Sequence, residues 1–592
     1  MSSRKFDFVI AVGGAAGQGI ATPGNILAKI FARSGLYFFA HNAYQSIIRG
    51  GHSFLTVRAS DTEVRNHGDT FHVLIALNQD TMDRHLKHMS TGTWVIYNSD
   101  TIKPGEANDG IQFCPMPVKV LSNNDRNKLV QNTVAIAAVV NLLGMGFETL
   151  ESVLNEYFKR KGEEVVNANV NVAKAAYGYT GENFKPYPAS VPTGSKPLAI
   201  WRGNDAIAMG AAAAGVKFYA AYPMSPASGI LHWMAQHARD LDIMVRQAED
   251  EISVINMIIG AAHSGCRAMC ATSGGGFALM TEAIGSAGMM EIPVVIVNTQ
   301  RGGPSTGLPT KTEQGDLWQA LGASQGDYPR IIVAPKNPLD AFDTIPQLFN
   351  LVDKYQCPGI LLSDEFSADE TSTIDPDLIN LQPEIDRGEL ITEPAPSNSY
   401  MRYKITKSGI SPRALPGLKG YSHVVATDEQ DEDGVLISDE FTNPGKRKLM
   451  MEKRMRKMAD VDKEVDRPRL EGPESDITLI GWGSTHGVIN ESIQQLNDQG
   501  IVANHLHIKW IVPFHATEVI GILAGCKKTI IVENNYSGLF YRYMRSETGV
   551  DVDGHIRKYD GEPFMPHHIT DGVKAILSGK TKKYVPEHEL LV

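Results

Sequence analysis

The chain has 592 residues, of which 42% are hydrophobic and 21% charged, a composition typical of a soluble globular protein, and its length predicts about four domains. Its formal net charge of −11 and its lack of a basic tail argue against binding to nucleic acid, which depends on clustered Lys and Arg. No apolar stretch approaches the about 18 residues of a membrane-spanning helix, and the N-terminus does not follow the pattern of a signal peptide, so we expect a cytoplasmic protein.

Alternating strand and helix patterns predict an α/β fold with three doubly wound domains. Residues 1–180 form the first, in which the strand FDFVIAV leads through the glycine turn GGAAGQGI into a helical pattern. Residues 181–196 are rich in Pro, Gly and Ser and are interpreted as a linker. Residues 197–366 repeat the alternation, which predicts a parallel sheet covered by helices.

The C-terminal half contains a connector and a third α/β unit. Residues 367–473 hold the acidic run DEQDEDG and a long charged helical segment around EKRMRK, interpreted mainly as a solvated connector or clamp helix. A contact between the methionines of that helix and a partner is the alternative. Residues 474–592 begin with a strand, a turn and a helix and form the last domain.

Five cysteines are scattered along the chain, an odd number that argues against a framework of disulfides. Cys266 and Cys270 are the only close pair. No further thiolate or histidine with ligand spacing lies near them, so we expect buried strand residues rather than a metal or iron–sulfur site.

The first glycine turn does not match the common phosphate-binding motifs. Gly13, Gly14, Gly17 and Gly19 differ in spacing from the dinucleotide fingerprint, and no Lys-Ser/Thr pair follows, as a P-loop requires. Two interpretations stay open, a site for a phosphate-bearing group and a tight turn with close packing of strand and helix.

Three unusual loops follow strands of the second domain. YPMSP comes after VKFYAA, TSGGG after RAMCA, and QRGGPSTG after VVIVN. Ligands bind at the carboxyl ends of the strands in open parallel sheets, where such loops diverge. The second domain is therefore expected to carry a ligand site.

Two charged residues stand near these loops. Glu251 begins an almost wholly apolar helix, where it either interacts with the helix dipole or has a pKa raised by burial and shares a proton. Arg301 follows the buried run VVIV and either binds a carboxylate or forms a structural ion pair.

Together these motifs resemble the fused gamma–alpha subunit of the 2-oxoacid:ferredoxin oxidoreductases, most closely the 2-oxoglutarate type. The resemblance rests on GGAAGQGI, NAYQSIIRGGHS, YPMSPAS, QAEDEIS, ATSGGGFALM, TQRGGPSTGLPTKTEQGDL, DEDG and EKRMRK, in the family's order along nearly the whole chain. It implies a gamma domain, a domain like those that bind the pyrimidine of thiamine diphosphate, and a domain like the C-terminal one of transketolase.

The resemblance also implies roles for single residues. Glu251 is implied to activate thiamine by contacting the aminopyrimidine ring of the cofactor. Arg301 and Ser225 are implied to hold the 2-oxoacid. Ser225 stands where the family has a threonine and keeps the hydroxyl group. The residues implied on the thiamine side are Tyr222, Pro223, Met224, Ser225, Pro226, Glu251, Gly274 and Gly275.

Weaker candidates lie in the first domain. The resemblance places coenzyme A near Gly14, Gly17 and Gly19. A second carboxylate, as in 2-oxoglutarate, needs a further cationic or donor group, for which Arg49, His41 and His52 are candidates.

Parts of the family's machinery are missing from the sequence. It has no GDG followed about 25 residues later by Asn, the pattern that holds magnesium and the diphosphate, and no cluster of cysteines. Mg²⁺ and a [4Fe-4S] cluster are therefore expected on a separate beta subunit, with ferredoxin as the electron acceptor. We expect a dimer of alpha–beta heterodimers and no metal on this chain.

The implied reaction is the reversible, coenzyme A-dependent conversion of 2-oxoglutarate to succinyl-CoA and CO2, with electrons passed to ferredoxin. Alternatives within the family are a pyruvate, broad 2-oxoacid or indolepyruvate oxidoreductase. Alternatives of another class are a non-redox, transketolase-like thiamine enzyme and a non-catalytic assembly subunit.

Overall fold

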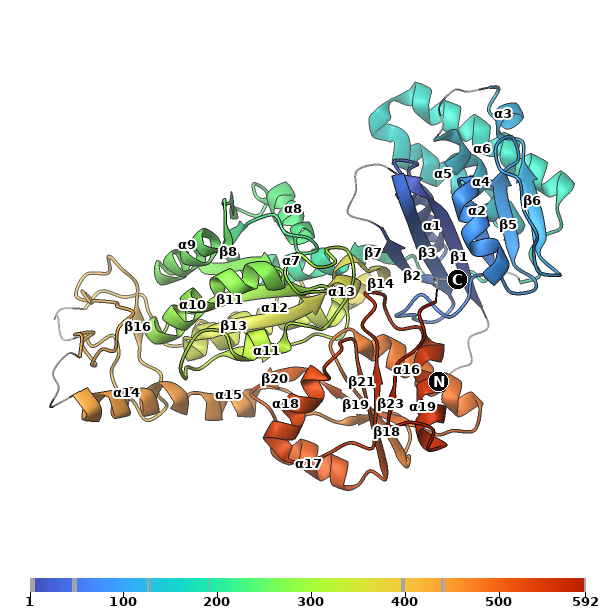
Figure 1. The fold of residues 1–592 in the computed structure, drawn as a ribbon. Helices are drawn as coiled ribbons and strands as arrows, with labels where there is room; N and C mark the ends of the chain where they lie inside the picture. The colour runs from blue at the N-terminus through green and yellow to red at the C-terminus, as the bar shows by residue number, and fades with distance from the viewer. Residues whose placement is uncertain are drawn as a thin grey trace.

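The computed structural model describes residues 6–44, 50–124, 127, 129–189, 191–395, 400–437, 441 and 443–589. Three α/β domains follow one another along the chain: the first is blue to cyan in Figure 1, the second green to yellow, and the third orange to red. The predicted fold class is confirmed. None of the helices in the described ranges is long and apolar enough to cross a membrane.

The first sheet has eight strands in the order β6-β5-β4-β1-β3-β2-β14-β7. The strands are β1 (Asp7–Ala16), β2 (Tyr37–Ala43), β3 (Gly50–Ser60), β4 (Val73–Ala76), β5 (Trp94–Asn98), β6 (Gln112–Met116), β7 (Ala199–Arg202) and β14 (Thr371–Ile374). The helices of this domain are α1 (Ala21–Arg33), α2 (Gln79–His85), α3 (Val118–Leu121), α4 (Val130–Leu142), α5 (Phe147–Phe158) and α6 (Glu163–Asn183).

This sheet departs from the expected parallel arrangement. Strands β1, β4, β5 and β6 are parallel, but β3 runs antiparallel to both β1 and β2. Strands β14 and β7, which lie outside residues 1–180, complete the sheet next to β2. Strands β14 and β2 are separated by more than 300 residues, and the hydrophobic pattern of a single strand does not show which distant strand it pairs with.

The second sheet has the order β20-β12-β13-β11-β10-β8-β9, and only β20 is antiparallel. Its strands are β8 (Val216–Ala221), β9 (Met244–Gln247), β10 (Arg267–Thr272), β11 (Val294–Gln300), β12 (Ile331–Val333), β13 (Pro358–Asp364) and β20 (Trp510–Val512). The helices are α7 (Gly203–Ala213), α8 (Ser228–His237), α9 (Glu251–His263), α10 (Gly274–Met290), α11 (Leu317–Leu321), α12 (Pro338–Tyr355) and α13 (Glu365–Asp369). Strands β10, β11 and β13 are buried along their whole length, as expected for parallel strands covered on both faces.

The third sheet has the order β17-β19-β18-β21-β22-β23. Its strands are β17 (Leu470–Glu471), β18 (Ile477–Trp482), β19 (Asn504–Ile508), β21 (Lys528–Glu533), β22 (Gly554–Arg557) and β23 (Lys583–Tyr584). The helices are α16 (Thr485–Asp498), α17 (Ala516–Ala524), α18 (Leu539–Thr548) and α19 (Pro566–Leu577). One hydrophobic core is shared with the second domain, through residues such as Trp482 and Phe540, so the two domains are packed together.

The connector contains β15 (Leu390–Ile391), β16 (Arg413–Ala414), α14 (Asn443–Arg456) and α15 (Met458–Glu464) and runs beside the second domain in Figure 1. Its charged helix was expected to be mainly solvated, but one face is not. Lys453 and Lys457 are completely buried, and both contact the carboxylate of Glu291 at 2.5 Å. The helix therefore clamps the end of α10 through buried ion pairs.

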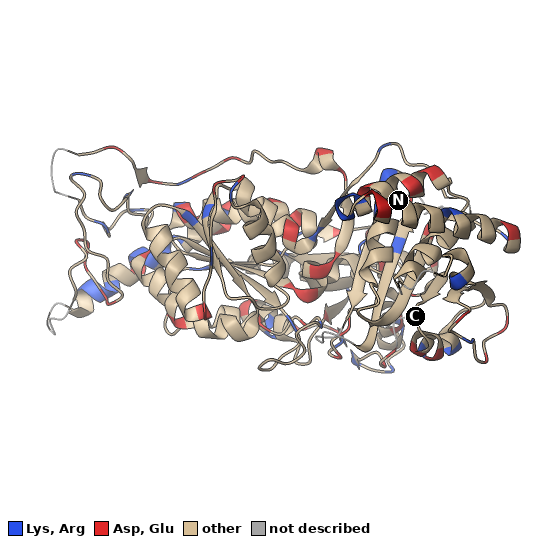
Figure 2. Ribbon diagram, turned by 90° about the horizontal axis from the view of Figure 1, so that it is seen from above, with Lys and Arg blue, Asp and Glu red and all other residues tan. Residues whose placement is uncertain are grey.

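Basic and acidic residues are mixed over the ribbon of all three domains (Figure 2).

Candidate functional site

The three unusual loops leave the same edge of the second sheet. Tyr222 follows β8, Ser273 follows β10 and Arg301 follows β11. These strands are neighbours and parallel, so their carboxyl ends meet. The loops therefore form one cluster at the edge where α/β proteins bind ligands.

The first loop is held from two sides. Arg301 Nη1 donates a hydrogen bond to the carbonyl of Ser225. Asn204 Nδ2, from the buried start of α7, donates to the carbonyl of Pro226 at 2.9 Å. Tyr222 and Pro223 remain exposed. The loop thus places Ser225 beside Arg301 and presents its outer residues to a partner or ligand.

Glu251 is the first residue of α9 and is only 3% exposed. Asp250, not Glu251, caps the helix, because its side chain accepts a hydrogen bond from the Ser253 amide at 2.7 Å. Within the described residues, Glu251 Oε1 has no hydrogen-bond partner. Burial raises the pKa of its carboxyl and the charge of Asp250 adds to the rise, whereas its own backbone amide and the nearby Thr272 hydroxyl oppose it. Glu251 is therefore not needed to cap the helix, and its Oε1 atom has the Thr272 hydroxyl nearby but forms no hydrogen bond of normal geometry in the described residues.

A glycine makes room for this carboxyl. A Cβ atom at Gly276 would lie 2.3 Å from Glu251 Oε1 and 2.1 Å from Thr272 Oγ1, closer than any real contact. At Gly274 a Cβ atom would lie 2.6 Å from the carboxylate oxygens of Asp316. The start of α10 thus has no side chains where two carboxyl groups approach it, and Gly275 between them is exposed.

Two acids near Arg301 were not singled out from the sequence. Asp316 accepts a hydrogen bond from Asn298 at 3.1 Å, and burial raises its pKa to about 6 against the opposing charge of Arg301. Burial and the charge of Asp316 raise the pKa of Glu313 to about 7. Both lie in TEQGDL, directly before the short apolar helix α11. The sequence signal that could have identified Asp316 is its position directly before this helix, where it occupies the N-cap.

The first-domain glycines lie away from these loops, at the turn between β1 and α1. The strand continues through Gly14 to Ala16, so the turn begins later than expected. The side chain of Gln18 accepts a hydrogen bond from the Ala15 amide at 2.7 Å, and Asn132 donates to the Gln18 carbonyl at 2.9 Å. Gly17 and Gly19 have positive φ values of 94° and 73°. These contacts are those of a tight turn.

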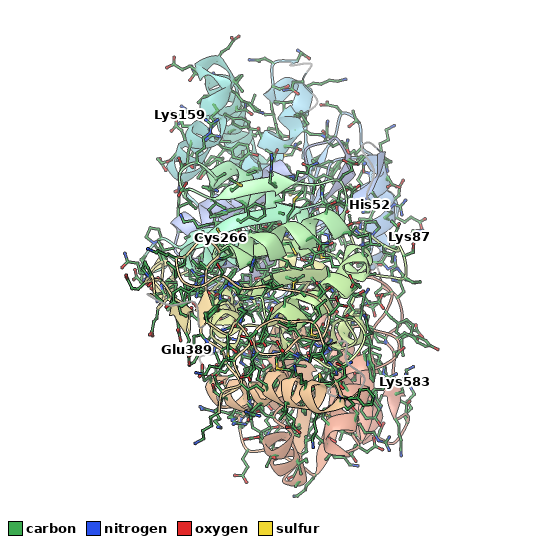
Figure 3. The ribbon with its side chains drawn as sticks, turned by 90° about the vertical axis from the view of Figure 1, so that its left-hand side faces the viewer. His52, Lys87, Lys159, Cys266, Glu389 and Lys583 are labelled. Carbon is green, nitrogen blue, oxygen red and sulfur yellow. The ribbon has the colours of Figure 1, made fainter. Side chains whose placement is uncertain are left out.

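The candidates for binding a second carboxylate are placed as follows. Arg49 lies outside the described residues. His41 is buried, which lowers its pKa to about 3. His52 lies in the first domain (Figure 3), with its Nε2 atom 2.9 Å from His85 Nε2. Within the described ranges, neither histidine forms a hydrogen bond or an ion pair with Ser225 or Arg301.

The two close cysteines are free thiols. Cys270 is buried within β10 as predicted, whereas Cys266 precedes the strand and is only partly buried, so the expectation of burial was wrong for that residue. Figure 3 places Cys266 in the second domain.

Comparisons with known proteins agree along the whole chain. The family described as "Pyruvate flavodoxin/ferredoxin oxidoreductase, thiamine diP-bdg" matches residues 209–446, and "Pyruvate ferredoxin/flavodoxin oxidoreductase" matches residues 9–179. The 2-oxoacid:ferredoxin oxidoreductase subunit alpha of Saccharolobus solfataricus is 31% identical over 97% of this chain and 98% of that protein. The 2-oxoglutarate oxidoreductase subunit KorA of Mycobacterium tuberculosis is 30% identical over 98% of this chain and 92% of that protein.

A solved structure shows the same fold. The 2-oxoglutarate:ferredoxin oxidoreductase from Magnetococcus marinus, with 2-oxoglutarate, coenzyme A and succinyl-CoA bound, is 33% identical and has a TM-score of 0.90, covering 97% of this chain and 100% of that one. The loops, the buried glutamate and the domain order lie within the matched region. This chain belongs to the family of 2-oxoacid:ferredoxin oxidoreductase alpha subunits.

Proposed function

We propose that this chain is the alpha subunit of a 2-oxoglutarate:ferredoxin oxidoreductase that uses thiamine diphosphate. The complex converts 2-oxoglutarate and coenzyme A to succinyl-CoA and CO2 and passes electrons to ferredoxin, with reductive carboxylation as the reverse reaction. The observation that carries the proposal is the buried carboxyl of Glu251, which has no partner on Oε1 within the described part of the chain. The substrate assignment is supported by relatives of the 2-oxoglutarate type.

The residues present fit thiamine diphosphate. An unpaired, buried carboxyl oxygen is costly unless a ligand group pairs with it, and the aminopyrimidine ring of thiamine offers such a nitrogen. When bound, thiamine diphosphate supplies the carbon nucleophile that attacks the keto carbon of a 2-oxoacid. Glu251 holds or shares the proton at its Oε1 atom, for which its raised pKa is suited. The exposed part of the SGGG turn and the YPMSP loop form the wall beside it.

Arg301 is proposed to bind the carboxylate of the substrate. Its Nη1 atom is fixed by the Ser225 carbonyl, and its other N–H groups have no acceptor among the residues described. A guanidinium held in this way pairs with a carboxylate in a defined orientation. The hydroxyl of Ser225 is proposed to contact the same substrate.

A beta subunit is proposed to complete the site. The loops and helices that follow β8 to β11 carry five apolar side chains that expose between 36% and 52% of their surface, as expected for an interface: Tyr222, Ile252, Leu279, Leu308 and Trp318. The partner is proposed to carry Mg²⁺, the diphosphate site and the [4Fe-4S] cluster, in a dimer of alpha–beta heterodimers. The first domain is proposed to hold coenzyme A.

Viologen dye reduction by the complex purified with its native partner tests the function. The assay is anaerobic, contains thiamine diphosphate, Mg²⁺ and coenzyme A, and compares 2-oxoglutarate with pyruvate. We expect coenzyme A-dependent reduction with 2-oxoglutarate and much slower reduction with pyruvate. Equal rates would overturn the substrate assignment, and no coenzyme A-dependent reduction with either 2-oxoacid would favour a non-redox thiamine enzyme.

A further inference from the structure

Three histidines and a glutamate meet where the connector joins the third domain. Glu471 lies in β17, His486 in α16, and His505 and His507 in β19. Strands β17 and β19 are antiparallel, and Glu471 is directly opposite His505, so their side chains project from the same face. His507, two residues further along β19, shares that face. Sequence positions 471 to 507 are thus brought together by the sheet.

Three of these side chains converge on one point. Glu471 Oε2 lies 2.9 Å from His486 Nε2. Together with a ring nitrogen of His505, these ligand atoms lie within 4.8 Å of one another. His505 is completely buried, and its Nε2 atom has no hydrogen-bond partner in the described ranges.

The proton positions in this group cannot all be satisfied by hydrogen bonds. Asn490 Oδ1 is 2.8 Å from His505 Nδ1, and Asn490 Nδ2 is 3.2 Å from His486 Nε2. In this orientation the amide donates to a lone pair on His486 Nε2, which then faces the Glu471 carboxylate without a proton between them.

The opposite orientation of the amide does not solve the problem. Asn490 would then donate to His505 Nδ1, and the proton of His505 would sit on Nε2, a buried position without an acceptor among the described residues. In either orientation a buried polar atom is left uncompensated, which is costly. A cation bound to Glu471 Oε2, His486 Nε2 and His505 Nε2 removes this conflict in the first orientation. The Asn490 amide N–H then releases His486 Nε2, because that nitrogen has only one lone pair in the ring plane.

We propose that Glu471, His486 and His505 bind a divalent transition-metal ion, with zinc as the best fit. Two imidazole nitrogens and one carboxylate oxygen form a ligand set that zinc accepts. Asn490 Oδ1 then takes the Nδ1–H of His505 and orients the ring, the part that an outer hydrogen bond plays at most metal-bound histidines.

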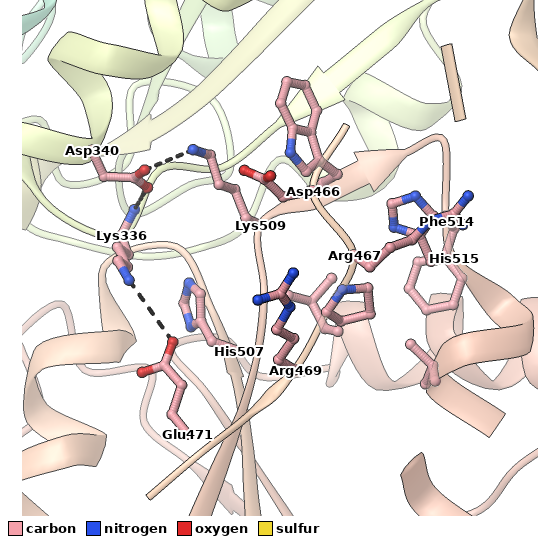
Figure 4. A pocket seen from close by; sticks show the side chains of 14 residues that line it. Lys336, Asp340, Asp466, Arg467, Arg469, Glu471, His507, Lys509, Phe514 and His515 are labelled. Atoms are coloured by element: carbon pink, nitrogen blue, oxygen red, sulfur yellow. Dashed lines mark hydrogen bonds and ion pairs between the residues drawn. The ribbon is translucent and has the colours of Figure 1, made fainter. Parts of the chain in front are cut away.

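The two carboxylate oxygens of Glu471 face different groups. Lys336 lies 3.8 Å from one oxygen, Oε1, as the dashed line in Figure 4 shows, and Oε2 remains for the metal.

The geometry needs a small contraction and allows entry of the ion. Ligand atoms around a tetrahedral zinc ion lie about 3.3 Å apart, whereas these atoms lie within 4.8 Å, so the most distant pair must close by up to about 1.5 Å. His507, whose ring centroid is 4.8 Å from that of His486, is a further imidazole beside the group that could take the fourth position. Glu471 and His507 line a cavity of about 310 Å³ that provides an access path (Figure 4).

Such an ion would have a structural role. It would join β17, which ends the connector, to α16 and β19 of the third domain, and so fix the connector at its C-terminal end. The clamp at Glu291 fixes the connector earlier in the chain, at Lys453 of α14.

Zinc content tests the proposal in the assembled complex. The complex is treated with EDTA, loaded with ZnCl2 and separated from free metal, and zinc is measured by mass spectrometry. We expect about one zinc per alpha chain, with Zn–N/O distances of about 2.0 Å and imidazole scattering in zinc-edge X-ray absorption, which iron does not disturb. Glu471→Gln and His505→Gln should each weaken zinc binding by about 100-fold or more in a competition titration.

Two variants serve as matched controls. Glu474→Gln removes an exposed acid three residues from Glu471, and His567→Gln alters a second group of His567, His568 and Glu589. Both should bind zinc like the native complex. Glu471 is partly exposed, so Glu471→Gln decides the question if His505→Gln does not fold. A native complex that retains no zinc, or loss of zinc in the controls instead, would overturn the proposal.

Discussion

Two buried glutamates at helix ends of the second domain have opposite environments. Glu251 begins α9, and the structure gives its Oε1 atom no partner within the described residues; burial raises its pKa. Glu291 ends α10 and is completely buried, but Lys453 and Lys457 each contact one of its oxygens at 2.5 Å. These two cations hold its pKa well below the usual range.

The two sites are also opposite with respect to the helix dipole. A carboxylate is favoured at the N-terminus of a helix and disfavoured at the C-terminus. Glu291 is therefore in the less favourable position and needs both lysines, and burial with mutual repulsion lowers the pKa of Lys453 to about 7. The comparison teaches that a buried charge with all its partners supports the structure, whereas one that lacks a partner marks a place for a ligand.

The largest effect is expected from Glu251→Gln. If the carboxyl shares a proton with the cofactor, the variant should lose about 10²–10⁴-fold in kcat for dye reduction, because an amide cannot take part in proton transfer. The thermal midpoint of the complex should change little. Glu249→Gln, which alters an exposed acid two residues away, is the control and should keep native activity. Native activity in Glu251→Gln would remove the residue from the mechanism.

The second effect is on stability and concerns Glu291→Gln. Removing the carboxylate leaves Lys453 and Lys457 buried with no counterion, which should lower the free energy of unfolding by about 3–5 kcal/mol. Chemical denaturation measures this, and activity per folded molecule should be unchanged. Asp460→Asn breaks an exposed ion pair with Lys463 and should lower the free energy of unfolding far less. Equal costs for the two variants would refute the clamp.

Arg301→Ala tests the same difference between paired and unpaired buried charges for a cation. Arg301 is partly buried with most of its donors unused, in contrast to Lys457, and we expect it to bind the substrate carboxylate. Loss of a charged hydrogen bond of about 1.5–3 kcal/mol predicts a rise in KM for 2-oxoglutarate of about 10–150-fold. Arg239→Ala, at an exposed position, is the control. An unchanged KM would place Arg301 outside the substrate site.

Gly276→Ala tests the space around Glu251 without changing its charge. The new methyl group would overlap Glu251 Oε1 and Thr272 Oγ1, so the carboxyl must move, at a cost of about 1–3 kcal/mol. Activity should fall by about 10–100-fold, since displaced catalytic groups lose rate steeply. Gly260→Ala in α9 has no atom within 4 Å of its Cβ and should be active and slightly more stable. If both variants behave alike, the close fit has no role.

The smallest effect concerns pH. Glu313 has its pKa raised from 4.5 to about 7, so its contribution to stability is fully present below pH 4.5 and is lost as the pH rises to about 7. Glu313→Gln should remove this part of the pH dependence and make the protein more stable than native at pH 8, by about 1 kcal/mol for a partly exposed group. Unfolding curves at pH 5 and 8 measure it. A native-like pH slope in the variant would contradict the assignment.

The sequence predicted the features that depend on local pattern. The alternation of strands and helices gave the α/β class, and the loops after β8, β10 and β11 indicated a ligand edge, because the carboxyl ends of parallel strands must meet. Glu251 stood out only as the first residue of an apolar helix. Only the structure shows that Asp250, which accepts a hydrogen bond from the Ser253 amide, caps the helix in place of Glu251.

Features that depend on distant partners could not be predicted. Lys453 lies in α14 and Lys457 in the turn before α15, four residues apart, but their counterion is more than 160 residues away in the chain. The pairing of β14 with β2 joins segments separated by still more residues. The raised pKa values of Glu313 and Asp316 follow from burial in a loop, which hydrophobic periodicity does not describe.

The central claim is that Glu251 acts on bound thiamine, and exchange of the thiamine C2 proton tests it most directly. The assembled complex is saturated with thiamine diphosphate, and exchange with deuterium is followed by NMR for the native protein, Glu251→Gln and Glu249→Gln. The account predicts that Glu251→Gln still binds the cofactor but exchanges the proton at least about 100-fold more slowly than the other two. Equal exchange rates with equal cofactor occupancy would contradict it.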